Sequence, residues 1–134
     1  MIKKLLIVIL FITITYGDTN LTIYSDYNKS LEVAQKKNKP LFILFSKPNC
    51  QWCEKLKSKI ITDINITKRL EDEFIVLFLD KQKDIYPSNF EIKAVPDVFL
   101  VSPNEEIYTE ILGYHKNSED YLKWFDYVMI EREI

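Results

Sequence analysis

The sequence predicts an α/β fold in which helices flank a central mixed β-sheet on both faces. Two apolar runs, residues 41–45 and 74–79, have strand length and no polar alternation, as in strands that are covered on both faces. Segments with apolar residues at helical spacing separate the strands and close the chain. The 134 residues are enough for one domain with a modest core.

The composition narrows the classes of function. Lys and Arg together number 18 against 20 Asp and Glu, which gives a formal net charge of −2, and there is no basic block. Nucleic-acid binding therefore has no electrostatic support. The hydrophobic fraction of 47% is ordinary for a globular chain with an apolar leader.

The first 17 residues are predicted to form a signal peptide. Two lysines form a charged start, residues 5–14 are apolar apart from one threonine, and Gly17 lies where a signal peptidase cuts. This run is shorter than the about 20 residues of an ordinary membrane span. We therefore expect cleavage near Gly17 and an exported, for example periplasmic, domain of residues 18–134 in an oxidising compartment. An uncleaved anchor is the alternative.

The mature chain should begin with a short strand over residues 21–24 and a helix over residues 26–37. Aromatic and apolar side chains recur at helical spacing here, with Lys and Gln between them, and core packing explains them. Asn38-Lys39-Pro40 ends the helix before the strand of residues 41–45. The recurring side chains are Tyr24, Tyr27, Leu31 and Ala34.

The two cysteines of the chain lie together in Cys50-Gln51-Trp52-Cys53, after a strand and a short loop and before a helix. The N-terminus of a helix carries unpaired N–H groups and the positive end of the macrodipole. A thiolate at Cys50 is stabilised there, so the pKa of Cys50 should fall. Cys53 lies one turn later on the same helix face. The motif predicts a redox-active disulfide with Cys50 as the catalytic nucleophile and Cys53 as the resolving thiol.

Three other roles of the cysteines compete with this prediction. A zinc site needs about four ligands, and His115 is the only other soft donor. Haem attachment requires a His directly after the second cysteine, where this chain has Glu54. A structural disulfide across three residues closes a tiny loop and constrains little. We therefore favour dithiol chemistry without metal or cofactor, and we expect His115 to be a surface residue.

The helix after the motif, residues 54–60, should bury a stripe formed by Cys53, Leu56 and Ile60. Its three lysines, which should lie in solvent, are Lys55, Lys57 and Lys59. The pattern then predicts a helix over residues 65–72, the strand of residues 74–79, a polar loop over residues 81–88 and a short helix over residues 89–93.

The last part of the chain predicts two antiparallel strands and a helix. The strands span residues 98–101 and 107–112, with a turn at residues 102–105 between them. Asn117 is the expected N-cap of the final helix, and acidic residues follow in its first turn. The predicted apolar face of this helix comprises Tyr121, Leu122, Phe125, Val128 and Met129.

The element order β-α-β-α-β-α-β-β-α, with CxxC after the second strand, resembles the thioredoxin superfamily over roughly residues 21–131. More narrowly, it is similar to exported thioredoxin-related proteins of the SoxW type and to the C-terminal domain of DsbD. The Val-Pro pair and the strand that follow downstream make the match more specific than CxxC alone. The matching stretches are Lys39-Pro40 with residues 46–53, Ala94-Val95-Pro96-Asp97-Val98-Phe99, and Ile111-Leu112-Gly113-Tyr114.

The resemblance implies a thioredoxin-like fold and exchange with protein disulfides. It assigns Pro96 as the family's cis-proline, which presents the Val95 backbone to an extended substrate strand. An ordinary trans proline at the start of a strand is the alternative. Trp52 either contacts substrate or shields the disulfide. The resemblance also implies a monomer that receives electrons from a membrane donor of the DsbD type.

Two positions depart from the family pattern. The family usually carries a buried acid six residues before the first cysteine, which exchanges protons with the second cysteine, and here that position is Leu44. The residue after the cis-proline is commonly Thr, and here it is Asp97. The resemblance therefore does not assign the group that handles the proton of Cys53.

The charges near the motif favour a disulfide reductase. Gln51 and Trp52 are uncharged, and the Glu54 carboxylate opposes a negative sulfur nearby. The nearest cation, Lys47, should be solvated. The helix terminus alone stabilises a thiolate by about 0.3–2 kcal/mol, which is moderate. A primary oxidant or isomerase, a redox-inactive binding module and a metal or thiol chaperone are the alternative functions.

Overall fold

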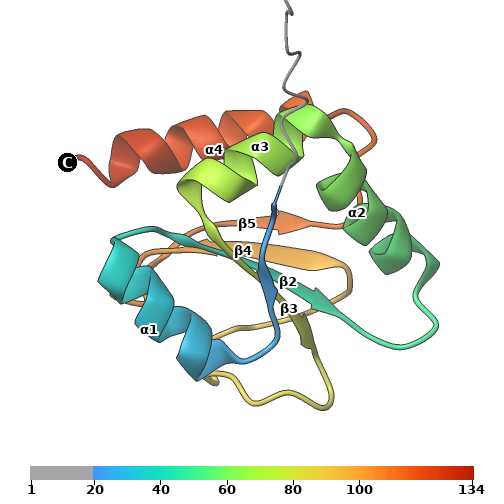
Figure 1. The fold of residues 1–134 in the computed structure, drawn as a ribbon. Helices are drawn as coiled ribbons and strands as arrows, with labels where there is room; N and C mark the ends of the chain where they lie inside the picture. Colours follow the sequence, from blue (N-terminus) through green and yellow to red (C-terminus); the bar gives the residue numbers. More distant parts are fainter. Residues whose placement is uncertain (1–19) are drawn as a thin grey trace, which may run out of the picture.

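The computed structural model describes residues 20–134, which form a five-stranded sheet and four helices (Figure 1). The predicted signal peptide of residues 1–17 lies outside the described residues. The strands are β1 (Ile23–Tyr24), β2 (Leu41–Ser46), β3 (Ile75–Asp80), β4 (Asp97–Val101) and β5 (Ile107–Leu112). The helices are α1 (Tyr27–Lys37), α2 (Gln51–Thr62), α3 (Ile64–Glu73) and α4 (Glu119–Glu131).

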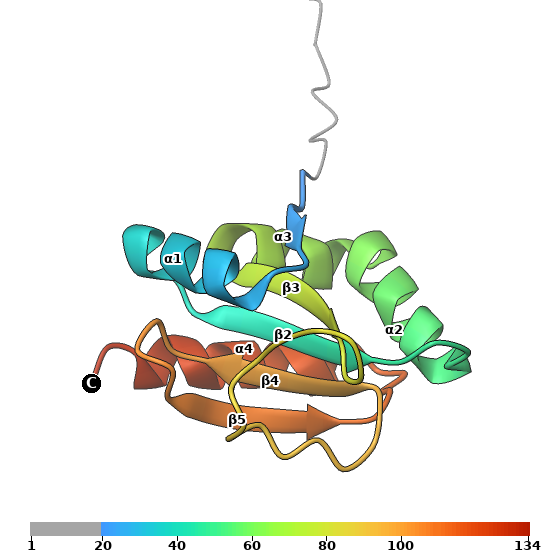
Figure 2. The ribbon, with the colours of Figure 1, turned by 90° about the horizontal axis from the view of Figure 1, so that it is seen from below.

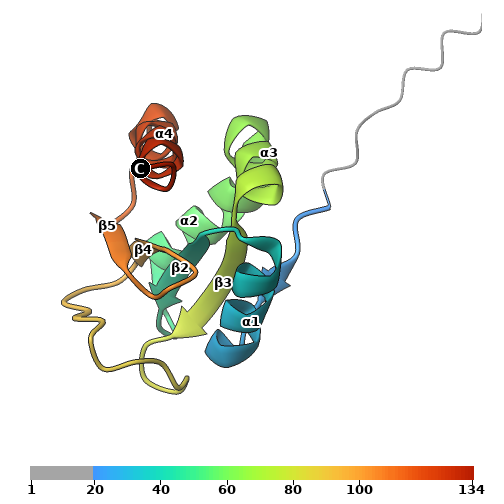
Figure 3. The ribbon, with the colours of Figure 1, turned by 90° about the vertical axis from the view of Figure 1, so that its left-hand side faces the viewer.

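The sheet is mixed, as predicted. Its strand order is β1-β3-β2-β4-β5 (Figure 2). β3 pairs in parallel with both β1 and β2, whereas β4 runs antiparallel to β2 and β5 antiparallel to β4. Helices α2, α3 and α4 cover one face, and α1 with the loop of residues 81–96 covers the other (Figure 3).

β2 is the centre of the core, and all six of its residues are buried. Phe42 and Leu44 pack among the three helices of one face, whereas Leu41, Ile43 and Phe45 pack against α1 and the opposite loop. Side chains alternate between the two faces of a strand, so a strand that is covered on both faces must be apolar throughout. This confirms the two-sided coverage that the unbroken apolar run predicts.

Local capping explains where the helices begin and end. Asp26 caps α1, because its carboxylate accepts a hydrogen bond from the Lys29 N–H at 2.8 Å. Asn38 ends α1 in the left-handed conformation with φ 49°, which Asn tolerates. Asp63 is both the C-cap of α2 and the N-cap of α3, and it separates two helices that cover the same sheet face.

The predicted helix over residues 89–93 is wrong, and no helix separates β3 from β4. Residue 89 lies in a turn, and residues 90–93 have no regular secondary structure. A five-residue segment cannot offset the cost of helix nucleation by itself. The Phe90 ring packs instead at 5.5 Å from Phe45 and 5.2 Å from Phe99, measured between ring centroids, and this anchors the loop to the sheet.

Two smaller predictions also need correction. Ser118, and not Asn117, is the N-cap of α4, although the Asn117 side chain accepts a hydrogen bond from the Glu119 N–H at 3.1 Å. Lys59 is not solvated, because its side chain is 14% exposed and donates to the Lys116 carbonyl at 2.9 Å. Both differences arise where α2 meets the start of α4, which are distant in sequence. Within residues 20–134, no helix has both the length and the apolarity to cross a membrane.

Candidate functional site

The two cysteines lie where the chain leaves the sheet and enters α2. β2 ends at Ser46, and an exposed loop leads to Cys50, which is the N-cap of α2 (Figure 1). Asn49 adopts a left-handed conformation with φ 58°, which turns the chain into the helix. The motif is therefore held between a fully buried strand and the first turn of a helix.

Cys50 and Cys53 form a disulfide with their Cα atoms 5.2 Å apart. The Cys50 sulfur accepts a hydrogen bond from the Cys53 N–H at 3.2 Å, as the cap of the helix. Cys53 is completely buried, whereas Cys50 is partly exposed. Cys50 is therefore the cysteine that an incoming thiolate can approach from solvent, and a thiolate left on Cys50 after reduction would face a helix N–H.

The charged side chains that flank the motif in sequence are exposed to solvent. The Glu54 side chain is 72% exposed and pairs with Lys57, with the nitrogen and oxygen 3.4 Å apart. Lys47 is exposed in the preceding loop. An ion pair at this exposure contributes little to stability. The main local source of positive potential for a thiolate is therefore the N-terminus of α2.

Trp52 lies on the surface of the first turn of α2. Its side chain is 51% exposed and stacks on Tyr114, with ring centroids 5.5 Å apart and an interplanar angle of 29°. The Lys55 ammonium lies 4.5 Å from the centroid of the Trp52 ring. The Trp52 and Tyr114 rings together form an exposed aromatic surface next to Cys50. Tyr114 was singled out only as part of a family motif, because nothing in the sequence spacing pairs it with Trp52.

The Val95–Pro96 peptide bond is cis, in agreement with the assignment of Pro96. Pro96 is buried and Val95 is partly exposed. The next residue, Asp97, pairs with Phe45 of β2, so Pro96 lies at the same end of the sheet as the exit of β2 into the motif. The Gly113 N–H donates to the Pro96 carbonyl at 2.9 Å, which links this segment to the end of β5.

Leu44, at the position of the family's buried acid, is completely buried. It belongs to the apolar cluster that includes Leu56 of α2 and Val98 of β4. The side chain at this position cannot take part in proton exchange.

His115 is half-buried and held at the start of the last helix. Its Nε2 lies 3.0 Å from the Leu112 carbonyl, and its Nδ1 lies 3.7 Å from the Asp120 carboxylate. These contacts account for both ring nitrogens. Among residues 20–134, no group of three or more His, Cys, Asp or Glu side chains is arranged to hold a metal ion.

Asp97 is the residue whose importance the sequence signals only as a departure from the family. Its side chain is completely buried, and neither carboxylate oxygen has a hydrogen-bond donor among the described residues. Burial, followed by the neighbouring Glu110 carboxylate, raises the pKa of Asp97 from 3.8 to about 8, while Lys81 acts in the opposite direction. A buried acid is therefore present next to Pro96, but not at position 44.

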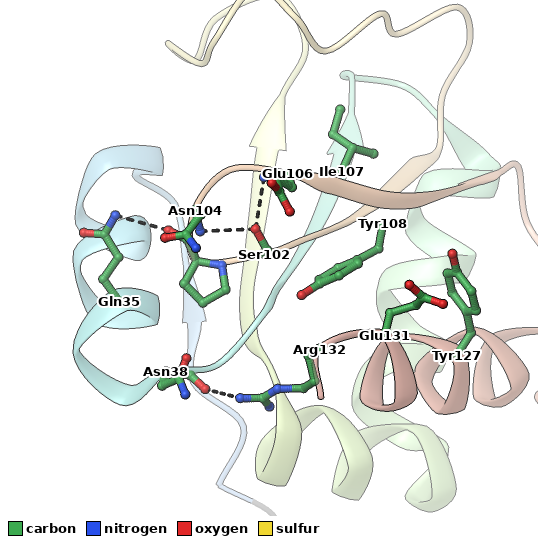
Figure 4. Close-up of a pocket in the computed structure, with 11 residues that line it drawn as sticks. Gln35, Asn38, Ser102, Asn104, Glu106, Ile107, Tyr108, Tyr127, Glu131 and Arg132 are labelled. Atoms are coloured by element: carbon green, nitrogen blue, oxygen red, sulfur yellow. Dashed lines mark hydrogen bonds between the residues drawn. The ribbon is translucent and has the colours of Figure 1, made fainter. Parts of the chain in front are cut away.

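A separate cavity of about 590 Å³ lies at the opposite end of the sheet (Figure 4). Its polar groups largely bond to one another: Gln35 donates to the Pro103 carbonyl at 3.2 Å, and Arg132 donates to the Asn38 carbonyl. None of the predicted site residues lines it. The other lining residues are Ser102, Asn104, Glu106, Ile107, Tyr108, Tyr127 and Glu131.

Two curated relatives match most of this chain at low identity. Mouse (Mus musculus) anterior gradient protein 3 is 29% identical over 105 residues, which cover 76% of this chain and 61% of that protein. Monothiol glutaredoxin-7 of Saccharomyces cerevisiae is 28% identical over 119 residues, which cover 82% of this chain and 54% of that protein. The chain therefore spans only 61% and 54% of the lengths of these two relatives.

Solved structures confirm the predicted thioredoxin-like fold. A thioredoxin from Thermus thermophilus superposes with a TM-score of 0.71 at 18% identity, over 84% of this chain and 89% of that chain. The DsbH oxidoreductase superposes with a TM-score of 0.64 at 18% identity, over 78% and 81% of the two chains. At these identities the likeness establishes the fold alone, and the narrower similarity to SoxW and DsbD stays a prediction.

A family match agrees with this fold. Residues 27–129 match the thioredoxin-like domain, and the matched region contains both cysteines and Pro96. It runs from the start of α1 into α4. Since the match covers well over half of its length, the chain belongs to the thioredoxin-like domain family.

Proposed function

We propose that this protein is a thiol–disulfide oxidoreductase that acts on protein disulfides through Cys50 and Cys53. One observation carries the proposal: the disulfide caps α2 with Cys50 partly exposed and Cys53 completely buried. A structural crosslink needs no such difference in exposure, whereas a two-step exchange requires one thiol for attack and one for resolution.

The exchange proceeds in two balanced steps when the protein acts as a reductant. The Cys50 thiolate attacks one sulfur of the substrate disulfide, so a Cys50–substrate disulfide forms and a substrate thiolate leaves. Cys53 loses its proton and its thiolate attacks the Cys50 sulfur, which releases the second substrate thiolate and forms the Cys50–Cys53 disulfide. The two substrate thiolates take up two protons, and two electrons pass from this protein to the substrate.

The surroundings of the motif support the reductive direction. A strong oxidant needs a very stable thiolate in its reduced form. Here the residues between the cysteines are uncharged, and the Glu54 carboxylate is exposed and paired with Lys57. Stabilisation then comes mainly from the end of α2 and stays moderate.

The proposal includes the place and the partners of the reaction. The charged and apolar leader supports export with cleavage near Gly17. In an oxidising compartment a reductase needs a supply of electrons, and a membrane donor of the DsbD type would provide it to a monomeric domain. The substrate would contact the exposed Trp52 ring and pair with the Val95 backbone beside Pro96.

Turnover of a protein disulfide, such as those of insulin, tests the proposal. The purified wild-type protein with a dithiol reductant should accelerate reduction, and Cys50→Ser should abolish this. Cys53→Ala should accumulate a mixed disulfide with substrate, because the resolving thiol is missing. Ser58→Ala, on an exposed position of the same helix, is the matched control and should keep turnover. A folded wild-type protein without turnover would favour the redox-inactive binding module.

A further inference from the structure

We propose that Asp97 is a positioning residue for substrate engagement: one proton shared between Asp97 and Glu110 joins the Val95–Pro96 segment to β5, and loss of that proton weakens substrate binding at alkaline pH. The inference rests on the proposed function, because it concerns the segment that would pair with an extended substrate.

The strand register brings the two carboxyl groups together. Asp97 is the first residue of β4, where its Cα pairs with Phe45 of β2 and with Leu112 of β5. Two residues later on the same strand face, Phe99 pairs with Glu110. Asp97 and Glu110 are therefore diagonal neighbours on one face of an antiparallel pair, where side chains interact.

The environment of Asp97 favours a protonated carboxyl group. Its side chain is completely buried and neither oxygen accepts a hydrogen bond from a described residue, so burial strongly penalises a charge there. The charged groups that face it are Glu110 from β5 and Lys81 from the segment after β3, while β2 presents the ring of Phe45. Glu110, in contrast, is exposed to solvent.

A single proton on Asp97 removes the electrostatic repulsion between the Asp97 and Glu110 carboxyl groups. Two ionised carboxylates have only acceptors and repel each other. A protonated Asp97 has a hydroxyl that can donate to the carboxylate of Glu110, its diagonal neighbour on the same strand face. A charge-assisted hydrogen bond of this kind is stronger than a neutral one.

This side-chain link adds to a backbone link at the same place. The Gly113 N–H donates to the Pro96 carbonyl at 2.9 Å, so Pro96 and Asp97 are both connected to β5 or the residue after it. Ionisation of Asp97 would replace an attractive contact with repulsion directly next to Val95–Pro96. Substrate binding should then weaken, while the chemistry at Cys50, on another element, should not change.

The test separates KM from kcat for a protein disulfide between about pH 6 and about pH 9. The KM of the wild-type protein should rise several-fold toward alkaline pH, and the KM of Asp97→Asn should stay flat, because the amide cannot ionise and still donates to Glu110. Glu110→Gln should also flatten KM, because its amide can donate to an ionised Asp97. Glu106→Gln, an exposed acid near the start of β5, is the matched control and should keep the wild-type profile.

Two further measurements make the outcome unambiguous. Carboxyl carbon NMR should show Asp97 titrating well above an ordinary Asp, with its midpoint lowered by Glu110→Gln. The rate of Cys50 alkylation against pH should be the same in wild type and Asp97→Asn. A rise in KM that persists in Asp97→Asn would overturn the inference. An Asp97 carboxyl group that titrates like an exposed acid in the wild-type protein would also overturn it, and this NMR measurement does not require Asp97→Asn to fold. Absence of wild-type turnover would reject the proposed function and the positioning role with it, whereas NMR still reports separately on the carboxyl pair.

Discussion

Cys50 and Cys53 are three residues apart in sequence, but their sulfurs have different surroundings. Cys53 lies on the buried stripe of α2 with Leu56 and Ile60, while Cys50 caps the helix at the surface. Cys50 precedes the first turn as the helix cap, and the helical period then places Cys53 on the stripe with Leu56 and Ile60 that faces the sheet. The burial of each sulfur therefore supports separate roles for two chemically identical side chains.

The first prediction concerns the reactivity of these thiols. In the fully reduced protein, iodoacetamide at mildly acidic pH should label Cys50 several-fold faster than Cys53, because Cys50 is accessible and faces a helix N–H. Peptide mapping by mass spectrometry measures the two rates. The oxidised protein is the control and should stay unlabelled. Faster labelling of Cys53 would contradict the assignment of the nucleophile.

At the scale of elements, Asp63 connects three helices. Its carboxylate accepts from the N–H groups of Asn65 at 3.1 Å and Ile66 at 3.4 Å, and the Ser118 hydroxyl at the start of α4 donates to it. Lys59 of α2 lies 3.6 Å from the same carboxylate. One residue thus ends α2 through its backbone N–H, and its side chain begins α3 and holds the start of α4, all on the face of the sheet that carries the cysteine helix.

The second prediction is that Asp63→Ala lowers the free energy of unfolding by about 1–2 kcal/mol at neutral pH, through loss of the helix cap. The hydrogen bond from Ser118, followed by backbone N–H groups and Lys59, lowers the pKa of Asp63. The contribution of Asp63 is therefore fully present above the pKa of an unfolded Asp, and it is lost as the pH falls through the lowered folded value.

Urea unfolding at neutral and at strongly acidic pH measures this effect. The difference in the free energy of unfolding between wild type and Asp63→Ala should shrink in acid, because Asp63 is then protonated in both the folded and the unfolded protein. Asp72→Ala, at an exposed position of α3, is the control and should change stability by less than about 0.5 kcal/mol. A loss that is equally large in acid would show that the carboxylate charge is not responsible.

At the scale of the whole molecule, the sheet order brings the parts of the site to one end. β2 leads into the loop and helix that carry the cysteines, and β4 begins with the residue after Pro96. These two strands are neighbours in the sheet, although about fifty residues separate them in sequence. The 590 Å³ cavity lies at the other end of β4 and shares no residue with the site. Disulfide exchange and any event in that cavity would therefore occur on separate surfaces.

The last prediction concerns the reduction potential of the whole protein. Equilibration of the Cys50–Cys53 pair with glutathione buffers should give a value near about −200 mV or lower, because the end of α2 is the main stabiliser of the thiolate and its effect is moderate. Alkylation followed by electrophoresis measures the reduced fraction, and Cys53→Ala, which cannot form the disulfide, is the control. A potential near about −120 mV would identify a primary oxidant and reject the reductase proposal.

Strands, helices with strong periodicity, the cysteine motif and the cis assignment of Pro96 could all be predicted from sequence, because each depends on local pattern or on a family motif. The order of the elements was correct except for residues 89–93, where the packing of Phe90 against the sheet outweighs a weak local preference. Short segments are decided by their tertiary contacts, and those contacts are not encoded in local periodicity.

The sequence by itself determined the fold class, the two-sided burial of β2 and the place of Cys50 at the start of a helix. Only the tertiary structure decided which groups become neighbours: Trp52 and Tyr114, the Lys59 ammonium and the Lys116 carbonyl, and Asp97 and Glu110 on adjacent strands. Hydrophobic spacing specifies which face of a strand or helix is buried, because burial follows the period of the element. It does not specify which element lies opposite, because strand pairing and helix packing join residues that are far apart in the chain.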